Sequence, residues 1–414
     1  MLNRIRVRGF KSLKDIEVRV PRLCVLFGPN AAGKSNLLDA LQSLSRIGTS
    51  KTLSDALAEP IRGYPIESFS FPRGGLAELL SREEILKFQI EAELSENGAK
   101  ALYLYRVELG IQPTSGSLLI TDEYLSTLNK TGAPKGNPSI ELVNNQIHIR
   151  RKSKPAHPRQ EPIQSNHSML SDLRFSGVEY QVIEACRTEL AGWRTYYLDP
   201  RIAMREAHTP ADVTDIGVVG ENIAPFLYRL RAEKPKHFDA VRRTLSSFIP
   251  SVEDLSVDLD KRRGTLDIQI RQDGIEFSSR IVSEGTLRVL ALCCIAVNPW
   301  TGQLIAFEEP ENGVHPRRIE LMAKLLSSLA LDQQRQVIVT THSPIFCDAI
   351  LRLAQKDGES IGLFNVKRGP EGTRISEFRW KGALFNDSEL AEAFQSESED
   401  GLFEKLILRG LLDE

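Results

Sequence analysis

The sequence predicts an α/β fold in which a mixed, largely parallel central sheet is combined with an N-terminal antiparallel β subdomain and an inserted helical lobe. The continuously apolar run 23–27 predicts a strand covered on both faces, and leucines repeat at helical spacing over 33–47. Further along, short apolar strands at 304–307 and 337–339 flank a helix at 316–330. This alternation predicts a parallel sheet, because two strands joined through a helix pair in parallel.

The antiparallel part is predicted by the alternation of apolar and polar residues. Residues 5–10 and 16–20 alternate in this way, and residues 85–94 and 101–111 do so around a Glu96-Asn-Gly98 turn. Two alternating runs separated by a short turn with glycine are typical of a hairpin. We therefore expect antiparallel strands both before and after the first parallel strand.

The middle of the chain changes character twice. Residues 112–172 contain repeated prolines and one predicted strand pair within 140–149. Residues 177–250 are predicted to be largely helical. The other predicted elements are a strand at 266–270, a buried helix at 286–297, two strands within 359–380 and a terminal helix at 403–412.

Composition excludes several classes of protein. The chain has 414 residues, and its 53 basic and 55 acidic residues give a formal charge of −2, which excludes coating of nucleic acid through bulk charge. Hydrophobic residues at 41% and charged residues at 26% exclude collagen-like, disordered and disulfide-scaffold classes. Five cysteines without a CxxC pattern predict reduced, buried thiols. With no secretory signal and no apolar run near ~20 residues, we expect a cytoplasmic protein without membrane contact.

One segment departs from this charge balance. Residues 130–160 contain seven basic residues and one acidic residue, a local charge of +6. The segment is either a solvated loop or a surface that contacts the phosphate backbone of double-stranded DNA. On the second interpretation, the candidate DNA-binding residues are Arg150, Arg151 and Lys152.

The strongest motif is GPNAAGKS at residues 28–35, which fits the pattern G-x-x-x-x-G-K-[ST] between the apolar strand and the helix. In this pattern, backbone N–H groups of the loop and of the helix N-terminus bind phosphates. Lys34 reaches the β- and γ-phosphate oxygens, and the Ser35 hydroxyl coordinates Mg²⁺. The candidate nucleotide-binding residues are Gly28, Pro29, Asn30, Ala31, Ala32, Gly33, Lys34, Ser35 and Asn36.

A second motif follows the strand 304–307, which ends in the adjacent carboxylates Glu308 and Glu309. Neighbouring residues of a strand point to opposite faces, so we expect the two acids to differ in role. One can hold the Mg²⁺ shell, and the other can polarise the attacking water.

Two further motifs are less specific alone. His342 follows the apolar strand at 336–341 and is either structural or in contact with the γ-phosphate; its place after the first two motifs favours the second interpretation. Ser283 opens the buried helix, where it is either a helix cap or, with Gly285, part of an anion site. Arg73, beside two glycines, either contacts nucleotide or a partner or is an exposed turn residue, and we favour the exposed turn.

Together the motifs resemble those of the ATP-binding-cassette (ABC) ATPases, specifically the RecF/SMC/OLD-like branch of AAA-family ATPases. The resemblance covers roughly residues 1–110 and 215–350. It is carried by RIRVRGFKSLKD (4–15), VLFGPNAAGKSNLLDAL (25–41), SEGTLR (283–288), FEEPENGVHP (307–316) and VTTHSP (339–344).

The resemblance implies a P-loop NTPase head that binds ATP and Mg²⁺ and hydrolyses ATP. It implies that Glu308 holds Mg²⁺ at the Walker B position and that Glu309 is the general base. It also implies that Asn312 and Gly313 belong to the D-loop, with Asn312 among the nucleotide-binding residues, and that His342 is the switch histidine. With Lys34, the expected catalytic residues are then Glu309 and His342.

The chain departs from the family pattern at three points. Thr286 stands where transport-type cassettes have a second signature glycine, as in this branch. Glu308 stands where Asp is commoner. The stretch 68–75, where a Q-loop is expected, contains no glutamine.

In this family the phosphate loop of one subunit faces the signature of another, so the resemblance implies a homodimer or higher oligomer with composite ATP sites. No heptads separate Ser35 from Ser283, which predicts a head without a long coiled coil. Residues 344–414 are fewer than the ~100 residues of an ordinary domain. We therefore expect no TOPRIM nuclease domain here, and a separate effector protein such as a nuclease or toxin.

Three functions stay open. The first is an ATPase switch that senses or clamps nucleic acid and controls an effector in anti-phage defence or DNA maintenance. The second is a RecF-like DNA-repair ATPase, and the third is a nucleotide-gated assembly scaffold with slow hydrolysis. The expected segments are an N-terminal ATPase lobe (1–111), a basic proline-rich insertion (112–175), a helical lobe (176–280), a C-terminal ATPase lobe (281–350), and C-terminal strands and helix (351–414).

Overall fold

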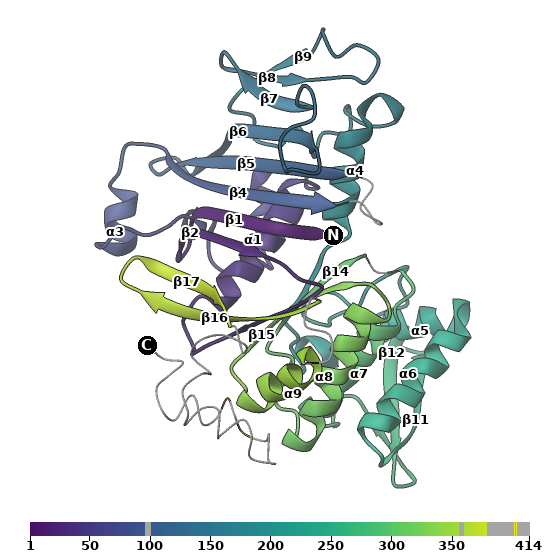
Figure 1. Cartoon of the computed structure of the whole chain (residues 1–414). Coiled ribbons are helices and arrows are strands. Elements are labelled where there is room, and N and C mark those ends of the chain that lie inside the picture. Colours follow the sequence, from purple (N-terminus) through teal and green to yellow (C-terminus); the bar gives the residue numbers. More distant parts are fainter. Residues whose placement is uncertain (96–100, 301, 356–359, 379–400, 402, 404–414) are drawn as a thin grey trace. The chain divides into compact units, whose positions relative to one another are not determined.

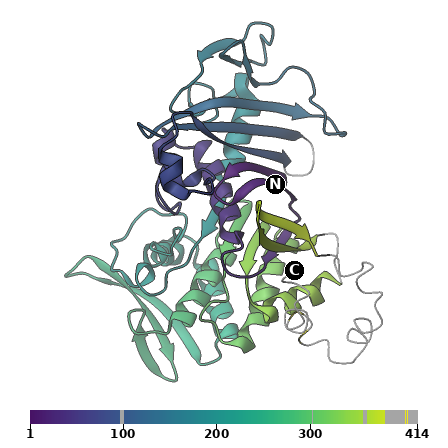
Figure 2. The same cartoon turned by 90° about the vertical axis from the view of Figure 1, so that its left-hand side faces the viewer.

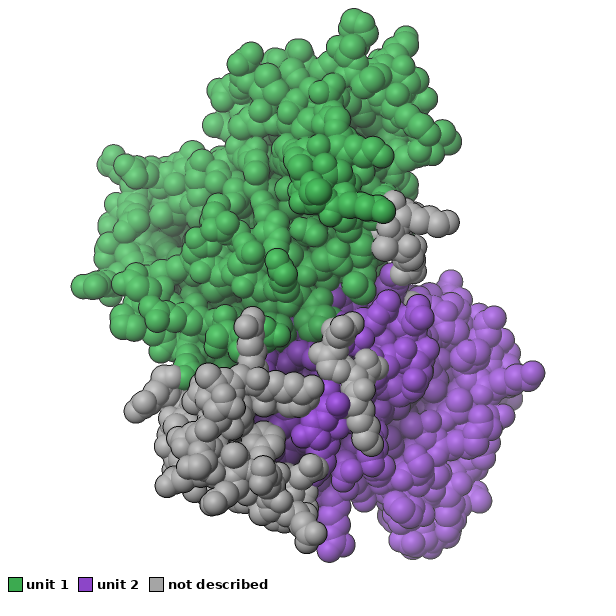
Figure 3. Space-filling view, in the orientation of Figure 1, with its two compact units in different colours: residues 1–21, 28–193, 364–377 green, residues 22–27, 194–363, 378–414 purple. Residues whose placement is uncertain are grey.

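The structure is a computed structural model that describes residues 1–95, 101–300, 302–355, 360–378, 401 and 403. The chain divides into two compact units, shown in green and purple in Figure 3. Unit 1 comprises residues 1–21, 28–193 and 364–377; unit 2 comprises residues 22–27, 194–363 and 378–414. Each unit combines segments that are far apart in the sequence. The five sequence segments expected above stay a prediction.

Unit 1 contains an eight-stranded sheet in which all neighbouring strands are antiparallel, in the order β2-β1-β4-β5-β6-β7-β8-β9. Its long strands lie side by side in Figures 1 and 2. Alternate apolar residues are buried, as Phe88, Ile90 and Ala92 are on β4. The strands are β1 (Leu2–Phe10), β2 (Leu13–Arg19), β4 (Leu86–Ser95), β5 (Leu102–Gln112), β6 (Ser117–Leu128), β7 (Ile140–Val143), β8 (Gln146–Ile149) and β9 (Arg159–Pro162).

Two helices pack on this sheet and on each other. Helix α1 (Lys34–Ile47) contacts β1, and α4 (Gln181–Ala191) contacts β5 and β6. Leu37, Leu38 and Leu41 of α1 are buried, as their spacing predicts. The remaining elements of unit 1 are α2 (Leu53–Ala56), η1 (Pro65–Ser68), α3 (Gly75–Leu80), η2 (Val178–Tyr180) and β17 (Gly372–Glu377), which pairs with β16 (Ile361–Gly369).

Unit 2 contains four parallel strands in the order β10-β14-β15-β3. Beyond β3 the sheet continues with β16, whose first residues belong to this unit. Every residue of β3 and β15 is buried, which is typical of a parallel strand covered on both faces. The four strands are β3 (Leu23–Phe27), β10 (Arg194–Tyr196), β14 (Leu304–Glu308) and β15 (Gln336–Thr341).

The apolar core of unit 2 joins these strands to helices α5 to α9 and to the antiparallel sheet β11-β12-β13. Helices α8 and α9 pack on each other, and α6 packs on both α5 and α7 (Figure 1). These elements are η3 (Ala203–Arg205), α5 (Ile223–Glu233), α6 (Pro235–Phe248), β11 (Val252–Asp260), β12 (Thr265–Gln272), β13 (Ile275–Ser278), α7 (Glu284–Val297), α8 (Pro316–Leu331) and α9 (Pro344–Ala354).

The predicted α/β fold with a mixed central sheet is confirmed: the six-stranded sheet combines four parallel strands with the antiparallel pair β16–β17, and the other two sheets are antiparallel. The predicted turn at 96–98 lies outside the described residues, and so does the terminal helix at 403–412 apart from Phe403. Among the described residues, five strands were not predicted, namely β6, β9, β10, β11 and β13. The pattern of β6 is obscured because Glu123 and Ser126 are polar yet completely buried, and β10 is a short strand within the region predicted to be helical.

All five cysteines are buried, as predicted, and burial raises the pKa of the Cys24 and Cys186 thiols above its ordinary range. Within the part of the chain that the structure describes, no helix is long and apolar enough to cross a membrane.

Glu123 is a buried carboxylate that ties β6 to the segment before α4. Its oxygens accept hydrogen bonds from the backbone N–H groups of Met169 (2.7 Å) and Leu170 (3.0 Å) and from the Tyr105 hydroxyl (3.0 Å). Burial outweighs these bonds and raises the pKa of Glu123 from 4.5 to about 7. The unfolded chain therefore releases this proton at lower pH than the folded chain does.

We predict that the free energy of unfolding decreases as pH rises from 4.5 to about 7, by roughly 3 kcal/mol from this group. Glu123→Gln, which cannot ionise, should flatten that slope, whatever its effect on absolute stability. Urea unfolding at several pH values measures the slope. Glu108→Gln, which removes a half-buried carboxylate of β5, should keep it; an unchanged slope in Glu123→Gln would show that this carboxyl ionises normally.

Candidate functional site

The loop at residues 28–33 has a backbone that only certain residues can adopt. Gly28 has a φ of 148°, Ala31 a φ of 62° and Gly33 a φ of 104°. A Cβ atom at position 28 would lie 2.2 Å from the carbonyl oxygen of Val366, so glycine alone fits there. Pro29, Asn30 and Ala31 are exposed at the tip of the loop, and Ala32 is buried.

Lys34 begins α1 and bends back over this loop. Its Nζ donates to the carbonyl oxygens of Gly28 (2.9 Å) and Pro29 (3.0 Å), and only 5% of the residue is exposed. A nearly buried ammonium group that bonds to neutral carbonyls is suited to an anion, because anionic oxygens are stronger acceptors. Ser35 follows in the first helical turn and is half-buried.

Asn36 lies in a chain of polar contacts that joins three segments of unit 1. Its Nδ2 donates to the Ser12 hydroxyl (2.7 Å), which lies 2.6 Å from the Thr373 hydroxyl. Thr373 in turn donates to the carbonyl oxygen of Ala32 (2.8 Å). The loop is thereby attached to the β1–β2 turn and to the β16–β17 hairpin.

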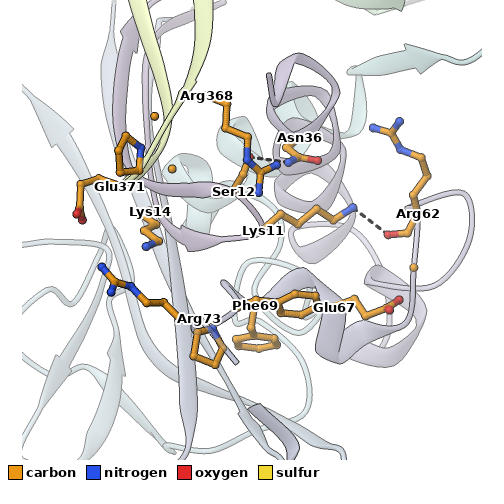
Figure 4. A pocket seen from close by; sticks show the side chains of 16 residues that line it. Lys11, Ser12, Lys14, Asn36, Arg62, Glu67, Phe69, Arg73, Arg368 and Glu371 are labelled. Atoms are coloured by element: carbon orange, nitrogen blue, oxygen red, sulfur yellow. Dashed lines mark hydrogen bonds between the residues drawn. The ribbon is translucent and has the colours of Figure 1, made fainter. Parts of the chain in front are cut away.

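Beside Asn36, unit 1 contains a pocket of about 700 Å³ (Figure 4). Ser12, Asn36 and the aromatic rings of Phe69 and Phe71 contribute to its walls. Five cationic side chains also line it, against the two carboxylates of Glu67 and Glu371, so the pocket favours anions. The cationic residues are Lys11, Lys14, Arg62, Arg73 and Arg368.

Two of these cations are held by one buried carboxylate. Asp39 of α1 is fully buried, and its Oδ2 accepts from Lys11 Nζ (2.7 Å) and Arg62 Nη2 (3.0 Å). Lys11 Nζ also donates to the Arg62 carbonyl oxygen at 2.8 Å, as Figure 4 shows. The pocket was not predicted, although Arg73, predicted as an exposed turn residue, is exposed and lines it.

In unit 2, the ends of three parallel strands bring the acidic and histidine motifs together. Glu308 at the end of β14 is opposite Thr340, and Thr341 at the end of β15 is opposite Phe27 of β3. Glu309 is one residue past β14, and His342 is one residue past β15. Gly28 follows Phe27 by one peptide bond.

Glu309 has a left-handed backbone with φ of 43°, an uncommon conformation for a residue other than glycine. Its carboxylate is held by two side chains: Oε2 accepts from Asn312 Nδ2 (2.7 Å), and Oε1 lies 3.1 Å from His342 Nδ1. The alternation expected of neighbouring strand residues does not apply, because β14 ends at Glu308. Asn312 thus contacts Glu309 within the chain, and its contact with nucleotide stays a prediction.

Glu311 is a buried acid that the sequence motifs did not single out. Its Oε1 accepts a hydrogen bond from the Thr341 hydroxyl, and burial raises the pKa of the carboxyl. Its Oε2 has no hydrogen-bond partner among the described residues. Glu311 therefore connects the turn after β14 to the end of β15, next to His342.

Ser283 and Gly285 form the start of α7. Ser283 caps the helix, because its Oγ accepts from the Thr286 backbone N–H at 3.2 Å. A Cβ atom at position 285 would lie 2.4 Å from the carbonyl oxygen of Gly313. Glycine at 285 thus permits close contact between the signature and the D-loop of the same chain.

The basic segment is less available for DNA than its composition predicts. Arg150 forms an ion pair with Glu141 and donates to the Pro138 carbonyl oxygen, and 14% of its side chain is exposed. Lys152 is exposed and donates to Gln181. Of the three candidate DNA-binding residues, Arg150 is therefore largely structural, because its charge is already paired.

Comparisons with known proteins identify relatives of this chain. The OLD nuclease of Thermus scotoductus (strain ATCC 700910 / SA-01) is 31% identical over 108 residues, which are 25% of this chain and 19% of that protein. The chain thus matches about a fifth of the length of this curated relative.

Two solved SMC heads are similar in structure. One is the SMC head bound to the C-winged helix domain of ScpA: it has 12% identity and a TM-score of 0.52, over 92% of this chain and 99% of that chain. The other, the SMC head domain from Thermotoga maritima, has 14% identity and a TM-score of 0.43, over 91% and 99%. The first shows that the fold is that of an SMC-type ABC ATPase head, as predicted.

A family model described as "AAA domain, putative AbiEii toxin, Type IV TA system" matches residues 23–348, well over half of the chain. The predicted resemblance to ABC-type ATPases of the SMC/OLD branch is confirmed. This chain belongs to the AAA-domain family that carries that description.

Proposed function

We propose that the chain binds ATP with Mg²⁺, hydrolyses it, and uses ATP-dependent pairing of two copies to control a separate effector. The observation that carries this proposal is the adjacency of strand ends in unit 2. Phe27, directly before the phosphate loop, pairs with Thr341, and Thr340 pairs with Glu308. Side chains that follow parallel strands gather at one sheet edge, where α/β proteins bind ligands.

Residues 28–36 are proposed to hold the phosphates, with Lys34 exchanging the carbonyls of Gly28 and Pro29 for phosphate oxygens. The pocket beside Asn36 is proposed to take the rest of the nucleotide, because its aromatic and cationic lining suits a base and an anion. Ser35 and Glu308 would hold Mg²⁺, which neutralises charge on the phosphates when bound. Across the described residues, no group of three or more His, Cys, Asp or Glu side chains could hold a metal ion. Such a group is not required here, because Mg²⁺ in nucleotide sites is bound by only one or two carboxylates together with the phosphates.

Glu309 is proposed as the general base that accepts a proton from the attacking water. Asn312 and His342 hold its two oxygens, which orients the carboxylate but leaves each oxygen with a donor. Each carboxylate oxygen has a further lone pair, which can accept the proton from the attacking water while these two contacts persist.

Ser283 and Gly285 are proposed to contact ATP held by a second copy, through the exposed N-terminus of α7.

The effector proposal is supported by the relatives' names, which include a nuclease, a toxin family and an SMC head bound to a winged-helix domain. Double-stranded DNA is proposed to bind the remaining basic residues Arg151, Lys152 and Lys154. DNA-stimulated hydrolysis would separate a nucleic-acid sensor or repair ATPase from a slow assembly scaffold.

Glu309→Gln should lower ATP turnover by about 10²–10⁴-fold, the usual contribution of a general base, while an ATP-bound dimer accumulates. Turnover and mass in the presence of ATP are the measurements. Glu320→Gln removes an exposed acid of α8 and should behave as wild type. Wild-type turnover in Glu309→Gln would move the general base to another residue.

Lys34→Ala should weaken ATP binding at least tenfold, because the variant removes a nearly buried cation from the loop. Titration with a fluorescent ATP analogue measures the affinity. Lys51→Ala, which removes an exposed lysine beyond α1, is the matched control. Equal affinities in wild type and Lys34→Ala would remove residues 28–36 from the nucleotide site.

Neutralising Arg151, Lys152 and Lys154 to Gln should weaken binding to double-stranded DNA and reduce the slope of log K against log salt by about 0.9 for each phosphate that the variant no longer neutralises. The control variant replaces Lys234, Lys236 and Arg243 by Gln, which removes the same charge from the region of α5 and α6 instead. Arg150→Gln should lower the melting temperature rather than the salt slope, because Arg150 is paired with Glu141. An unchanged affinity and slope in the triple variant would identify the segment as a solvated loop.

A further inference from the structure

The turn before α7, residues 280–283, lies between β13 and the helix and belongs to neither. We call it the signature turn. Two of its carbonyl groups bond to the guanidinium of Arg205, which is far away in the sequence. Arg205 Nη1 donates to the carbonyl oxygen of Arg280 (2.6 Å), and Nη2 donates to that of Val282 (2.8 Å). One side chain therefore satisfies backbone groups that have no partner strand or helical turn.

Arg205 is itself fixed by its own segment. Its Nε donates to the carbonyl oxygen of Pro200 (2.8 Å), so all three nitrogens of the guanidinium bond to backbone oxygens. Asp199 folds this segment, because its Oδ1 accepts from the backbone N–H groups of Arg201 (3.0 Å) and Ile202 (3.2 Å). Hydrogen bonds from a charged donor are stronger than those from a neutral donor, so the Arg205 guanidinium holds the signature turn firmly.

We propose that Arg205 is a positioning residue for the signature: it holds the signature turn so that Ser283 and Gly285 can meet ATP bound to a second copy. The inference rests on the proposed function, which assigns that contact to Ser283. A nucleotide contact requires its donors to lie within about 0.5 Å of their productive positions. A turn with two released carbonyls would not hold Ser283 so closely, although ATP binding by the single chain would be unaffected.

The other end of the same helix offers a matched control. Arg335 donates to the carbonyl oxygens of Ile295 (3.1 Å) and Asn298 (2.7 Å), at the C-terminus of α7. Arg205 and Arg335 are both half-buried, and each bonds to backbone carbonyls at one end of α7. Replacing either one by Gln should cost similar stability, but only Arg205 adjoins Ser283.

The experiment uses the full chain with Glu309→Gln, the variant in which we expect ATP to persist. Arg205→Gln, Arg335→Gln, Ser283→Ala and the double variant Arg205→Gln/Ser283→Ala are compared by ATP-dependent association in analytical ultracentrifugation. ATP affinity is measured at concentrations too low for association. We expect Arg205→Gln to weaken association at least tenfold with ATP affinity within twofold, and Arg335→Gln to change association less than threefold. The double variant should associate as Ser283→Ala does, because both changes act on the same interaction.

Three results would overturn the inference. Arg205→Gln could associate as tightly as its Glu309→Gln parent, or Arg335→Gln could weaken association as much as Arg205→Gln does. In the third, the double variant would associate more weakly than Ser283→Ala alone, by the factor that Arg205→Gln shows by itself. Failure of the parent Glu309→Gln chain to associate with ATP would instead reject the proposed function, and the inference with it. Arg205→Lys keeps the charge but not the fork of donors, so it carries the same test if Arg205→Gln does not fold. It should show an intermediate weakening.

Discussion

The parallel pairing of β3, β15 and β14 is the constraint on which the candidate site depends. Its hydrogen-bond ladder sets Phe27 beside Thr341 and Thr340 beside Glu308. A shift of one residue would turn every side chain of a strand to the opposite face, which fully buried strands do not permit. Three motifs, of which the first precedes the other two by more than two hundred residues, therefore begin at neighbouring strand ends. The segments just past those ends carry the candidate functional groups.

Those segments have irregular backbones, and charged or polar side chains fix them. In unit 2, Asn312 holds Glu309, Glu311 joins the end of β15, and Arg205 holds the signature turn. In unit 1, Asp39 holds two cations of the pocket. The common physical reason is that backbone and charged groups away from strands and helices have no regular partner, and burying them unpaired is costly.

The sequence predicted elements well where one periodicity dominates. The apolar run of β3, the leucine spacing of α1 and the alternation of β4 each have a single interpretation, and each was confirmed. Prediction failed at β6, where a buried Glu123 breaks the apolar pattern, because its partners Met169 and Leu170 are distant in sequence. It also could not show that Arg150, one of the candidate DNA-binding residues, is paired with Glu141.

By itself the sequence determined the phosphate loop, the order of the motifs and the family, because these depend on residue types at short spacing. Only the tertiary structure decided that Asn312 bonds to Glu309, that Glu309 lies beyond its strand in a left-handed conformation, and that five cations gather at one pocket. It also decided that Arg205 bonds to a turn more than seventy residues away. Such contacts depend on which segments pack together, and no local pattern of residues encodes that choice.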